Sequence, residues 1–406
     1  MTEIFQLERN PFRPGMGLDP PYLADREFQL RRFARYLDGF PEFPRNVRVT
    51  GLRGVGKTVL VQRYTALAEE AGWVVVRREL GESLGHESAF GLALIDDCRQ
   101  ALNRISRRRA ASTKASGAMR SALDLLGGLS VSIAGIGSVA LRVRVAAPRP
   151  QPVLDDQLFA AIEATCRIAA HAGRHGVILC YDEAHLVRDS RHARQFPLSA
   201  LLSAVARAQR EGVPVMLIVC GLPPLTDNLA LAKSYSERMF QAEVLGALTP
   251  PEDVNAFVHP ILESHRRLDS GLGELVRADT KGFAFHVQFF GAALWDALSP
   301  HEPITCERFQ QLRPAILEAL DHAFFDARLA RTSRTERLLL CAIAEDGEQA
   351  AVGAVRQRIG GNKNITNRLI GRLIAKGLVH RPERSRLAFS VPLFGDYLRR
   401  KGLVDG

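Results

Sequence analysis

The residues with the clearest chemical meaning form a glycine-rich loop, Gly51-Leu52-Arg53-Gly54-Val55-Gly56-Lys57-Thr58, followed by Val59. This G-x-x-x-x-G-K-[ST] pattern lies between a strand-like run, 47–50, and a helical pattern, which is the setting of a phosphate-binding loop. Its glycines are expected to adopt positive φ and to turn backbone N–H groups toward phosphate, beside a helix N-terminus. Lys57 would contact the β- and γ-phosphates, and Thr58 would ligate Mg²⁺. The loop predicts a site for a nucleoside triphosphate with Mg²⁺.

Hydrolysis needs acidic groups as well, and the apolar run 176–181 ends in Asp182 and Glu183. We expect Asp182 to complete the Mg²⁺ shell and Glu183 to orient and polarise the attacking water. Side chains of neighbouring strand residues point to opposite faces, so the two acids can have different tasks. The letters Asp182-Glu183-Ala184-His185 also spell a helicase box, but no other helicase motif accompanies them. His185 fits a capping or packing role better.

Arg238 precedes the last strand-like run and is a candidate arginine finger that would reach the γ-phosphate of a neighbouring subunit. From the residues alone, a surface salt bridge explains Arg238 equally well. The run 213–220 leads into Gly221 and ends in Cys220, which is a poor γ-phosphate sensor. A buried central strand explains that run, and we assign no sensor residue.

Basic residues near the C-terminus form a candidate surface for double-stranded DNA, because each Lys or Arg that meets a phosphate releases counterions. On or beside the second helix of a helix-turn-helix pattern, and on the hairpin after it, lie Lys363, Arg368, Arg372, Lys376, Arg381, Arg384 and Arg386. A helix of this kind fits the major groove. The alternative is a solvated basic face on a domain that binds protein or packs against the rest of the chain.

Composition places the 406 residues among globular proteins of two or three domains, with 46% hydrophobic and 24% charged residues. Two segments are strongly positive within a chain of net charge +10: 104–150 has nine Lys or Arg and one Asp, and 331–406 has fifteen Lys or Arg and seven acids. Such local positive charge favours an anionic partner, nucleic acid first and acidic lipid second. The six cysteines are scattered without metal-ligand spacing, so we expect reduced thiols and no metal site beyond Mg²⁺. The first residues have no basic or apolar leader, and a cytoplasmic protein is expected.

The elements that must position these groups alternate short apolar strands with longer helical patterns, which predicts a parallel sheet covered on both faces. Strands are expected at 46–50, 73–78, 177–181, 214–220 and 241–246, and helices at 57–71, 87–105, 154–173 and 196–211. The segment 106–152 interrupts this order. Because apolar residues alternate from Val131 to Val145, we expect a basic β-hairpin there rather than a membrane helix.

The remaining segments predict a front collar, a helical lid and a winged helix-turn-helix. Capping boxes are expected to start two of the helices, one at Thr249 with Glu252 and one at Ser333 with Glu336. The predicted domains are a collar and adenine-side segment, an ATPase core with its hairpin insertion, a lid and a winged helix domain, at 1–44, 45–248 (insertion 106–152), 249–328 and 329–406.

Taken together, the ordered motifs resemble the AAA+ ATPases of the origin-initiator clade, and most closely a bacterial group of ATP-binding proteins with an origin-initiator-like AAA domain. The resemblance covers roughly 10–400 and is carried by Asn10 to Gly15, Asp25-Arg26-Glu27, Gly51 to Thr58, Tyr181 to Glu183, Gly221-Leu222-Pro223, Ser234 to Phe240 and Phe389 to Phe394. It implies a sheet order of 5-1-4-3-2, an adenine pocket partly formed by 25–30, and Arg238 as the finger. The chain departs from the family in the lid segment 282–288, which lacks the arginine that many such lids place near the γ-phosphate. Lys281 or His286 would have to replace it.

The leading hypothesis is an ATP-dependent switch that hydrolyses ATP slowly, assembles into homo-oligomers and contacts DNA, without a membrane. A signalling NTPase, in which the winged helix regulates the ATPase or binds a protein, is the second hypothesis. The third is a binding module that has lost catalysis.

Overall fold

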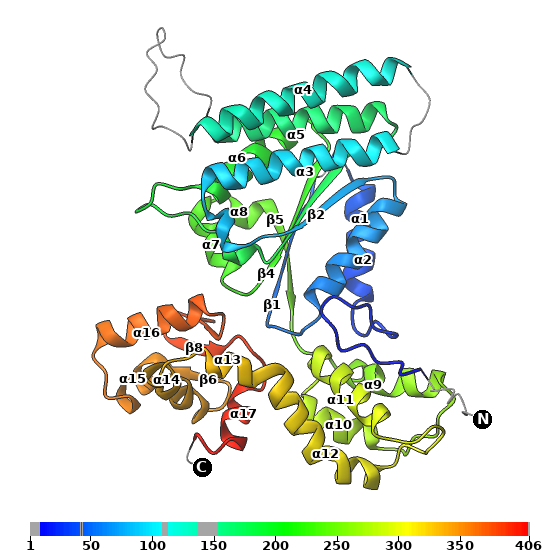
Figure 1. Cartoon of the computed structure of the whole chain (residues 1–406), viewed down its shortest axis with the longest axis vertical. Coiled ribbons are helices and arrows are strands. Elements are labelled where there is room, and N and C mark those ends of the chain that lie inside the picture. The colour runs from blue at the N-terminus through cyan, green and yellow to red at the C-terminus, as the bar shows by residue number, and fades with distance from the viewer. Residues whose placement is uncertain (1–8, 41, 43, 108–112, 137–152, 405–406) are drawn as a thin grey trace, which may run out of the picture. The chain divides into compact units, whose positions relative to one another are not determined.

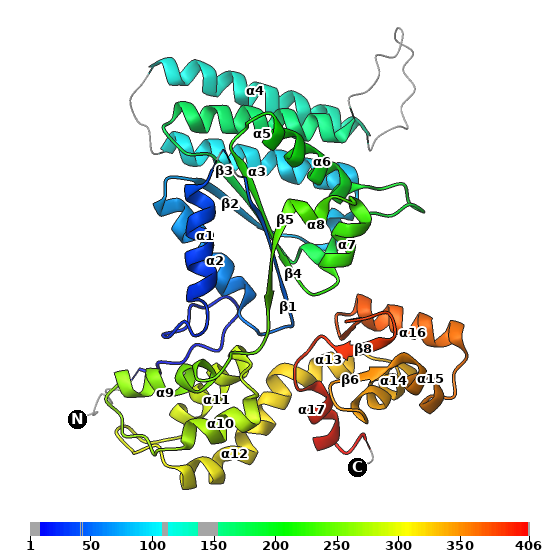
Figure 2. The same cartoon turned by 180° about the vertical axis from the view of Figure 1, so that it is seen from behind.

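The computed structural model describes residues 9–40, 42, 44–107, 113–136 and 153–404. The chain divides into two compact units (Figures 1 and 2). The first, which we call the sheet unit, consists of Phe28–Thr50 and Leu60–Val244. The second, the C-terminal unit, consists of Met1–Glu27, Gly51–Val59 and Leu245–Gly406. The glycine-rich loop therefore belongs to the same compact unit as the C-terminal part of the chain.

The sheet unit is built around a five-stranded sheet in the order β2-β3-β4-β1-β5. Its β2–β3, β3–β4 and β4–β1 pairings are parallel. Read from the other end, this is the expected order 5-1-4-3-2, so the expected α/β fold class is confirmed. The strands are β1 Asn46–Gly51, β2 Val74–Glu79, β3 Val177–Asp182, β4 Val215–Gly221 and β5 Phe240–Leu245.

The apolar runs of the sequence form the central strands, because helices cover both faces of a parallel sheet. Every residue of β4 is buried, and β3 is buried up to Asp182. Asn46, at the start of β1, ties the sheet together: its side chain accepts a hydrogen bond from Leu217 N and exchanges two with Gln209. Each predicted strand agrees with the structure to within one residue at either end.

Helices cover the sheet on both faces, and α1 and α2 lie beside each other in both views (Figures 1 and 2). Phe33 of α1 stacks on Tyr64 of α2 with ring centroids 4.2 Å apart. On the other face α3, α5 and α6 pack in succession. The helices are α1 Glu27–Asp38, α2 Lys57–Glu70, α3 Glu87–Arg107, α4 Thr113–Ile136, α5 Leu154–His171, α6 Pro197–Arg210, α7 Leu225–Ala232 and α8 Ser236–Met239.

The expected hairpin in 106–152 is wrong in its first half, because Val131 and Ile133 belong to helix α4. Apolar residues at 119, 122, 126, 129 and 133 recur at helical spacing and pack on the core, and this period prevails over the alternation near Val131. Ile133 lies against Gly91 of α3. The second half of the hairpin lies outside the described residues. Among the described helices none is long and apolar enough to cross a membrane.

In the C-terminal unit, α9 to α12 form the helical region expected as a lid. These helices are α9 Glu252–Glu263, α10 Leu272–Thr280, α11 Ala284–Asp296 and α12 Cys306–Leu320. The capping box expected at Thr249 is wrong, since Pro251 precedes α9 and the Thr249 hydroxyl donates to Asp25. Glu252 instead accepts hydrogen bonds from Tyr22 and from the Asp25 backbone N–H. The front collar therefore takes up the groups that would have capped the helix.

The last part of the chain is compatible with a winged helix. After the π-helical turn η3 Asp321–Asp326, its elements are α13 Ala327–Ala330, α14 Arg334–Ala344, β6 Gln349–Ala351, α15 Val352–Arg358, α16 Lys363–Ala375, β7 Val379–His380, β8 Arg386–Phe389 and α17 Phe394–Arg400. Strands form a small antiparallel sheet in the order β6-β8-β7. The sequence prediction missed β6. The capping box of Ser333 and Glu336 is confirmed at the start of α14.

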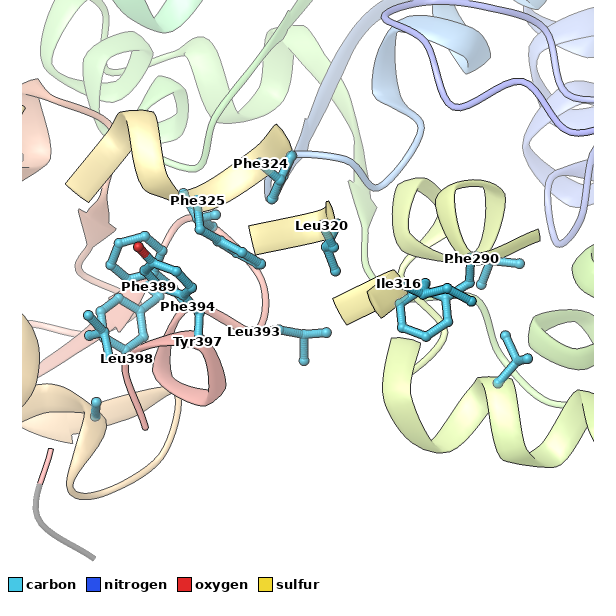
Figure 3. Packing of buried hydrophobic residues seen from close by; sticks show 14 of the residues in the cluster. Phe290, Ile316, Leu320, Phe324, Phe325, Phe389, Leu393, Phe394, Tyr397 and Leu398 are labelled. Carbon is cyan, nitrogen blue, oxygen red and sulfur yellow. The ribbon is translucent and has the colours of Figure 1, made fainter. Parts of the chain in front are cut away.

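Aromatic rings dominate the core of the C-terminal unit where η3 meets α17 (Figure 3). Phe325 stacks on Tyr397 with centroids 4.9 Å apart, and Phe394 lies 5.9 Å from Phe325. Its neighbour Phe324 packs edge-on against Phe325, with centroids 5.1 Å apart, and stacks on Phe285 of α11. The turn η3 therefore joins α11 to the last domain through two adjacent rings that contact each other.

Candidate nucleotide site

The glycine-rich loop needs its glycines for two different reasons. Gly54 and Gly56 have φ of 77° and 89°, the left-handed region in which other residues are strained. A Cβ on Gly51 would lie 2.4 Å from the Leu245 carbonyl oxygen, so this position needs glycine for close backbone approach. Positive φ was expected at all three, and the structure corrects this for Gly51. A Cβ on Gly56 would meet nothing within 4 Å, so this position needs glycine for its backbone conformation and not for space.

Lys57 begins helix α2 and is 8% exposed, because it folds back over the loop. Its ammonium donates a hydrogen bond of 2.9 Å to the Leu52 carbonyl oxygen. Thr58 follows within the first turn of α2 and is partly buried. Lys57 and Thr58 thus lie where the glycine-rich loop leads into α2.

Arg26 supports the loop from the front collar. It is 5% exposed and donates to the Val55 carbonyl oxygen at 3.0 Å. The sequence offered Arg26 only as part of a family motif, within the segment 25–30 expected to form part of an adenine pocket. No spacing rule could have found this contact, since it joins residues 29 apart in sequence.

Two further backbone hydrogen bonds attach the loop to the C-terminal part of its unit. The Phe285 N–H, in the first turn of α11, donates to the Gly54 carbonyl oxygen at 2.9 Å. The Arg53 N–H donates to the Ser390 carbonyl oxygen at 3.1 Å, just after β8. Loop residues 53 and 54 are therefore held by the lid and by the last domain at once.

The acidic residues lie at the end of β3 in the sheet unit. Asp182 is the last residue of the strand, and its carboxylate accepts a hydrogen bond of 2.8 Å from the Glu183 N–H. Glu183 has φ of 52°, a left-handed conformation that is uncommon for a residue other than glycine. This turn ends the strand at Asp182, and the separate tasks of the two acids stay a prediction.

His185 has a more specific place than the packing role expected for it. Its Nε2 lies 3.5 Å from a Glu183 carboxylate oxygen. The backbone N–H of Leu222 points at Nδ1 from 3.3 Å, so the ring proton belongs on Nε2, facing Glu183. Gly221 leaves the room for the imidazole, because a Cβ there would lie 3.0 Å from Nδ1. His185 thus connects Glu183 to the end of β4.

Behind the strand end, a buried polar network fixes the residue before Asp182. The Tyr181 hydroxyl donates to Asp97 of α3 at 3.0 Å, and Arg78 of β2 donates to the same carboxylate at 2.7 Å. Burial raises the pKa of Asp97, although Arg78 and Tyr181 oppose the shift. Sequence reasoning missed this network, because three elements contribute to it.

Sheet topology relates the strand that leads into the loop to the strand that ends in the acids. Both β1, which leads directly into Gly51, and β3 are parallel neighbours of β4. The carboxyl ends of parallel strands meet at one edge of a sheet, which is where α/β folds bind ligands. The chain therefore leaves β1 for the loop at the edge at which Asp182 ends β3.

Other predicted groups have more varied surroundings. Arg238 of α8 is exposed, and no hydrogen bond or ion pair of its side chain occurs within the described part of the chain. Cys220 is completely buried in β4. Lys281 forms an ion pair with Asp396 at 2.6 Å. His286 is 1% exposed, and burial, together with Arg400, lowers its pKa to about 3.

The predicted DNA residues divide into two groups. Exposed side chains without an ion pair, again within the described ranges, are Lys363, Arg368, Arg372, Arg384 and Arg386. Lys376 is engaged instead, since its ammonium contacts the buried Glu336 carboxylate at 2.6 Å and the Arg331 carbonyl oxygen at 2.8 Å. The exposed group lies on α16 and on the hairpin of β7 and β8.

Comparison with known proteins agrees with this geometry. Residues 22–219 match the AAA ATPase domain, and 322–398 match a domain of unknown function, DUF8462. No curated protein matches the sequence. A Walker-type ATPase of Pyrococcus abyssi has a similar structure, with 16% identity over 93% of this chain and 96% of that one and a TM-score of 0.59.

Two proteins of Aeropyrum pernix give lower scores. ORC2 in its ADP form has 14% identity over 96% of this chain and 97% of its own, with a TM-score of 0.49. ORC1, solved in complex with DNA, has 16% identity over 94% of each chain and a TM-score of 0.43. Neither likeness supports a conclusion. The sheet order, the loop and the match over 22–219 define a P-loop AAA+ ATPase fold, and the matched region contains the loop and both acids.

Proposed function

We propose that this protein binds ATP with Mg²⁺ and hydrolyses it slowly as a molecular switch. One observation carries the proposal: within a region that matches the AAA ATPase domain, β1 leads into the glycine-rich loop at the sheet edge where β3 ends in Asp182 and Glu183. Supporting evidence is the left-handed backbone of Gly54 and Gly56 and the hydrogen bond from Lys57 to the Leu52 carbonyl oxygen.

The residues present fit the chemistry of a Mg²⁺-nucleotide. Backbone N–H groups of the loop and Lys57 would hold the phosphates, while Thr58 and Asp182 would hold the metal, whose hard charge prefers oxygen ligands. Bound Mg²⁺ supplies neutralisation of the charge that develops on the phosphate oxygens. Glu183 would orient and polarise the attacking water, and the Nε2–H of His185 would keep its carboxylate in place.

The direct test measures ATP binding and turnover in the same preparations. Glu183→Gln should keep ATP binding but slow hydrolysis about 10²-fold or more, because only the group that activates water is lost. Lys57→Ala should lose binding. Glu211→Gln is a matched control at an exposed position, and its turnover should equal that of the parent. Equal turnover of Glu183→Gln and the parent would contradict the role of Glu183.

We infer a homo-oligomer in which Arg238 acts on the nucleotide of a neighbour. Its exposed side chain, without a partner in the described residues, supports this proposal. An arginine finger contributes about 10³-fold or more to turnover, so Arg238→Ala should be nearly inactive. A mixture of Arg238→Ala and Glu183→Gln should recover activity, because each variant supplies what the other lacks. A mixture that stays at the summed activity of its components would contradict a finger in trans.

Contact with double-stranded DNA is the remaining part of this proposal. The exposed cations of α16 support it, and binding should weaken with salt because counterions are released. The double variant Arg368→Ala/Arg372→Ala should reduce the slope of log affinity against log salt by about two. Arg356→Ala, an exposed arginine of α15, is the control and should leave the slope nearly unchanged. Affinity that hardly changes with salt would contradict DNA contact.

A specific observation favours a second candidate, a signalling NTPase whose last domain regulates the ATPase or binds a protein. Ser390, which follows β8, accepts a hydrogen bond from the loop residue Arg53. If this contact is regulatory, deletion of 333–406 should change nucleotide affinity without any DNA present. Unchanged nucleotide affinity after the deletion would favour the DNA-contacting switch.

A further inference from the structure

Three arginines of the C-terminal unit gather next to the glycine-rich loop. They are Arg53 in the loop, Arg328 in α13 and Arg331 directly after α13. Among the described residues no ion pair includes any of the three. The acids of the adjacent turn are used elsewhere, because Asp321 pairs with Arg400, and Asp326 accepts a hydrogen bond from Tyr397.

Arg328 is held in place by the turn that precedes it. Its guanidinium lies over the ring of Phe324 at 4.4 Å and donates to the Phe324 carbonyl oxygen. The side chain is partly buried, unlike the exposed cations of α16. A guanidinium fixed in this way loses little conformational freedom when it binds a ligand.

The same ring connects Arg328 to the loop. Phe324 stacks on Phe285 with centroids 4.7 Å apart, and the Phe285 N–H holds the Gly54 carbonyl oxygen. A Cβ built on Gly54 would lie 2.9 Å from the Phe285 Cβ and 3.9 Å from the Phe324 ring. Phe324 lies on η3 (Figure 3) and also packs edge-on against Phe325. The loop, the two rings and Arg328 thus form one continuous packed unit.

Electrostatics makes this cluster unfavourable on its own. Burial first, and then the charges of Arg53 and Arg331, lower the pKa of Arg328 to about 10. Three like charges with no carboxylate among them repel one another, and an anion is the group that removes the repulsion. One guanidinium can donate two parallel hydrogen bonds to two oxygens of the same phosphate. Phosphate is therefore the anion that this chemistry favours.

We propose that Arg53, Arg328 and Arg331 bind the terminal phosphate of a nucleoside triphosphate held in the loop, and thereby fasten the last domain to the loop only in the triphosphate state. This inference rests on the proposed function. A diphosphate lacks the terminal group and leaves the three cations to repel one another, which weakens the attachment that Ser390 and Phe285 provide. The cluster would take the place of the arginine that lid segment 282–288 lacks.

The position of the cluster favours nucleotide phosphate over phosphates of DNA. Arg53 belongs to the loop itself, within a backbone that already turns N–H groups toward phosphate. Arg328 is partly buried and fixed on Phe324, whereas a DNA backbone needs exposed cations in a row. Both sources share the chemistry of phosphate, and the experiment separates them.

The test compares Arg328→Gln, Arg328→Lys and the control Arg334→Gln, an exposed arginine of α14. Calorimetry measures affinity for ADP and for a non-hydrolysable ATP analogue with Mg²⁺. Arg328→Gln should weaken the analogue about 10- to 100-fold and leave ADP nearly unchanged, since charge-assisted hydrogen bonds to the terminal phosphate are lost. Arg328→Lys should recover part of the difference, and the control should match the parent.

Hydrogen exchange over 321–333 gives a second measurement that does not depend on turnover. In the parent, the analogue should protect these amides more than ADP does, and Arg328→Gln should abolish the difference. If Arg328→Gln weakened the affinity for ADP and for the analogue equally, or weakened neither, the inference would be overturned and the proposed ATP binding would stand. Lost binding of a DNA duplex by Arg328→Gln, with its nucleotide preference unchanged, would assign the cluster to DNA and overturn it too. A parent that binds neither nucleotide would overturn the proposed function itself.

Discussion

In the sheet unit, the strand that ends in Asp182 is held by an ionic network, whereas in the C-terminal unit the loop is held by rings and backbone hydrogen bonds. The network consists of Tyr181, Asp97 and Arg78. The loop depends on Phe285, with Phe324 stacked behind it. Charged contacts of this kind fail when one partner is removed, while packed rings fail when their shape is disturbed. The two parts of the proposed site should therefore respond to different substitutions.

The largest effect is expected from Arg78→Met in the ionic network. Asp97 has a side chain that is 1% exposed, and it would lose the cation that compensates its charge. An uncompensated buried charge costs about 3–5 kcal/mol, which urea denaturation would measure as lost free energy of unfolding. The double variant Arg78→Met/Asp97→Asn should recover much of this loss, because the buried charge is gone. A cost below about 1 kcal/mol for Arg78→Met would show that the network does not hold β3.

A smaller effect is expected at the loop, where two glycines form a matched pair. Alanine at Gly56 meets no neighbour, so it should cost only the strain of positive φ, about 1–2 kcal/mol. Gly54→Ala adds a Cβ only 2.9 Å from Phe285 and should cost about 1–3 kcal/mol more. Denaturation without nucleotide measures both. If Gly54→Ala and Gly56→Ala cost the same free energy of unfolding, the rings would not support the loop, and the two units would not differ in the proposed way.

Local patterns were enough to predict the strands of the sheet and to indicate the candidate residues of the site. The run before Asp182 is apolar at every position because β3 is buried on both faces, and this signal needs no knowledge of other segments. The loop from Gly51 to Thr58 is equally local, since its spacing follows from the shape of one turn. Ser333 and Glu336 formed their expected capping box for the same reason.

Contacts between distant segments account for what the sequence could not provide. The Asp25 carboxylate accepts a hydrogen bond from the Thr249 hydroxyl, 224 residues away, so the capping box expected at Thr249 did not form. Arg26 and Asp97 look like ordinary surface charges until the fold brings their partners to them. In α4, a helical period from 119 to 133 competed with an alternating one, and packing on α3 decided between them.

His286 allows the aromatic side of the comparison to be tested by pH. Neither ring nitrogen has a hydrogen-bond partner among the described residues, and rings of Phe285, Phe324 and Phe325 surround the imidazole. Because a buried polar group without a partner costs about 1–3 kcal/mol, His286→Leu should raise the free energy of unfolding by about 1–2 kcal/mol at pH 7.

The sign of the pH dependence follows from the low pKa of His286, about 3 in the folded chain against an ordinary value of 6.5. Below pH 6.5, His286 binds a proton in the unfolded chain but stays neutral in the folded chain. The parent therefore loses stability as pH falls from 6.5 toward 3. The loss is at most about 1.4 kcal/mol per pH unit, and His286→Leu should lack it. Urea denaturation at pH 7, 6 and 5 measures the difference. Parallel curves for the two proteins would show that His286 is protonated in the folded state.

The smallest effect is expected from Ser333→Ala, which removes one polar contact far from the rings. The Ser333 hydroxyl accepts a hydrogen bond from the Glu336 N–H at 3.3 Å, while the Glu336 carboxylate still holds the Ser333 N–H at 2.7 Å and Lys376 at 2.6 Å. One lost cap costs about 1 kcal/mol, and Ser333→Thr, which keeps the hydroxyl, should cost less. Because the rings around Phe325 do not touch this cap, nucleotide affinity should stay at the parent value. A cost above about 3 kcal/mol would show that polar contacts, and not packed rings, dominate the C-terminal unit as they do around Asp97.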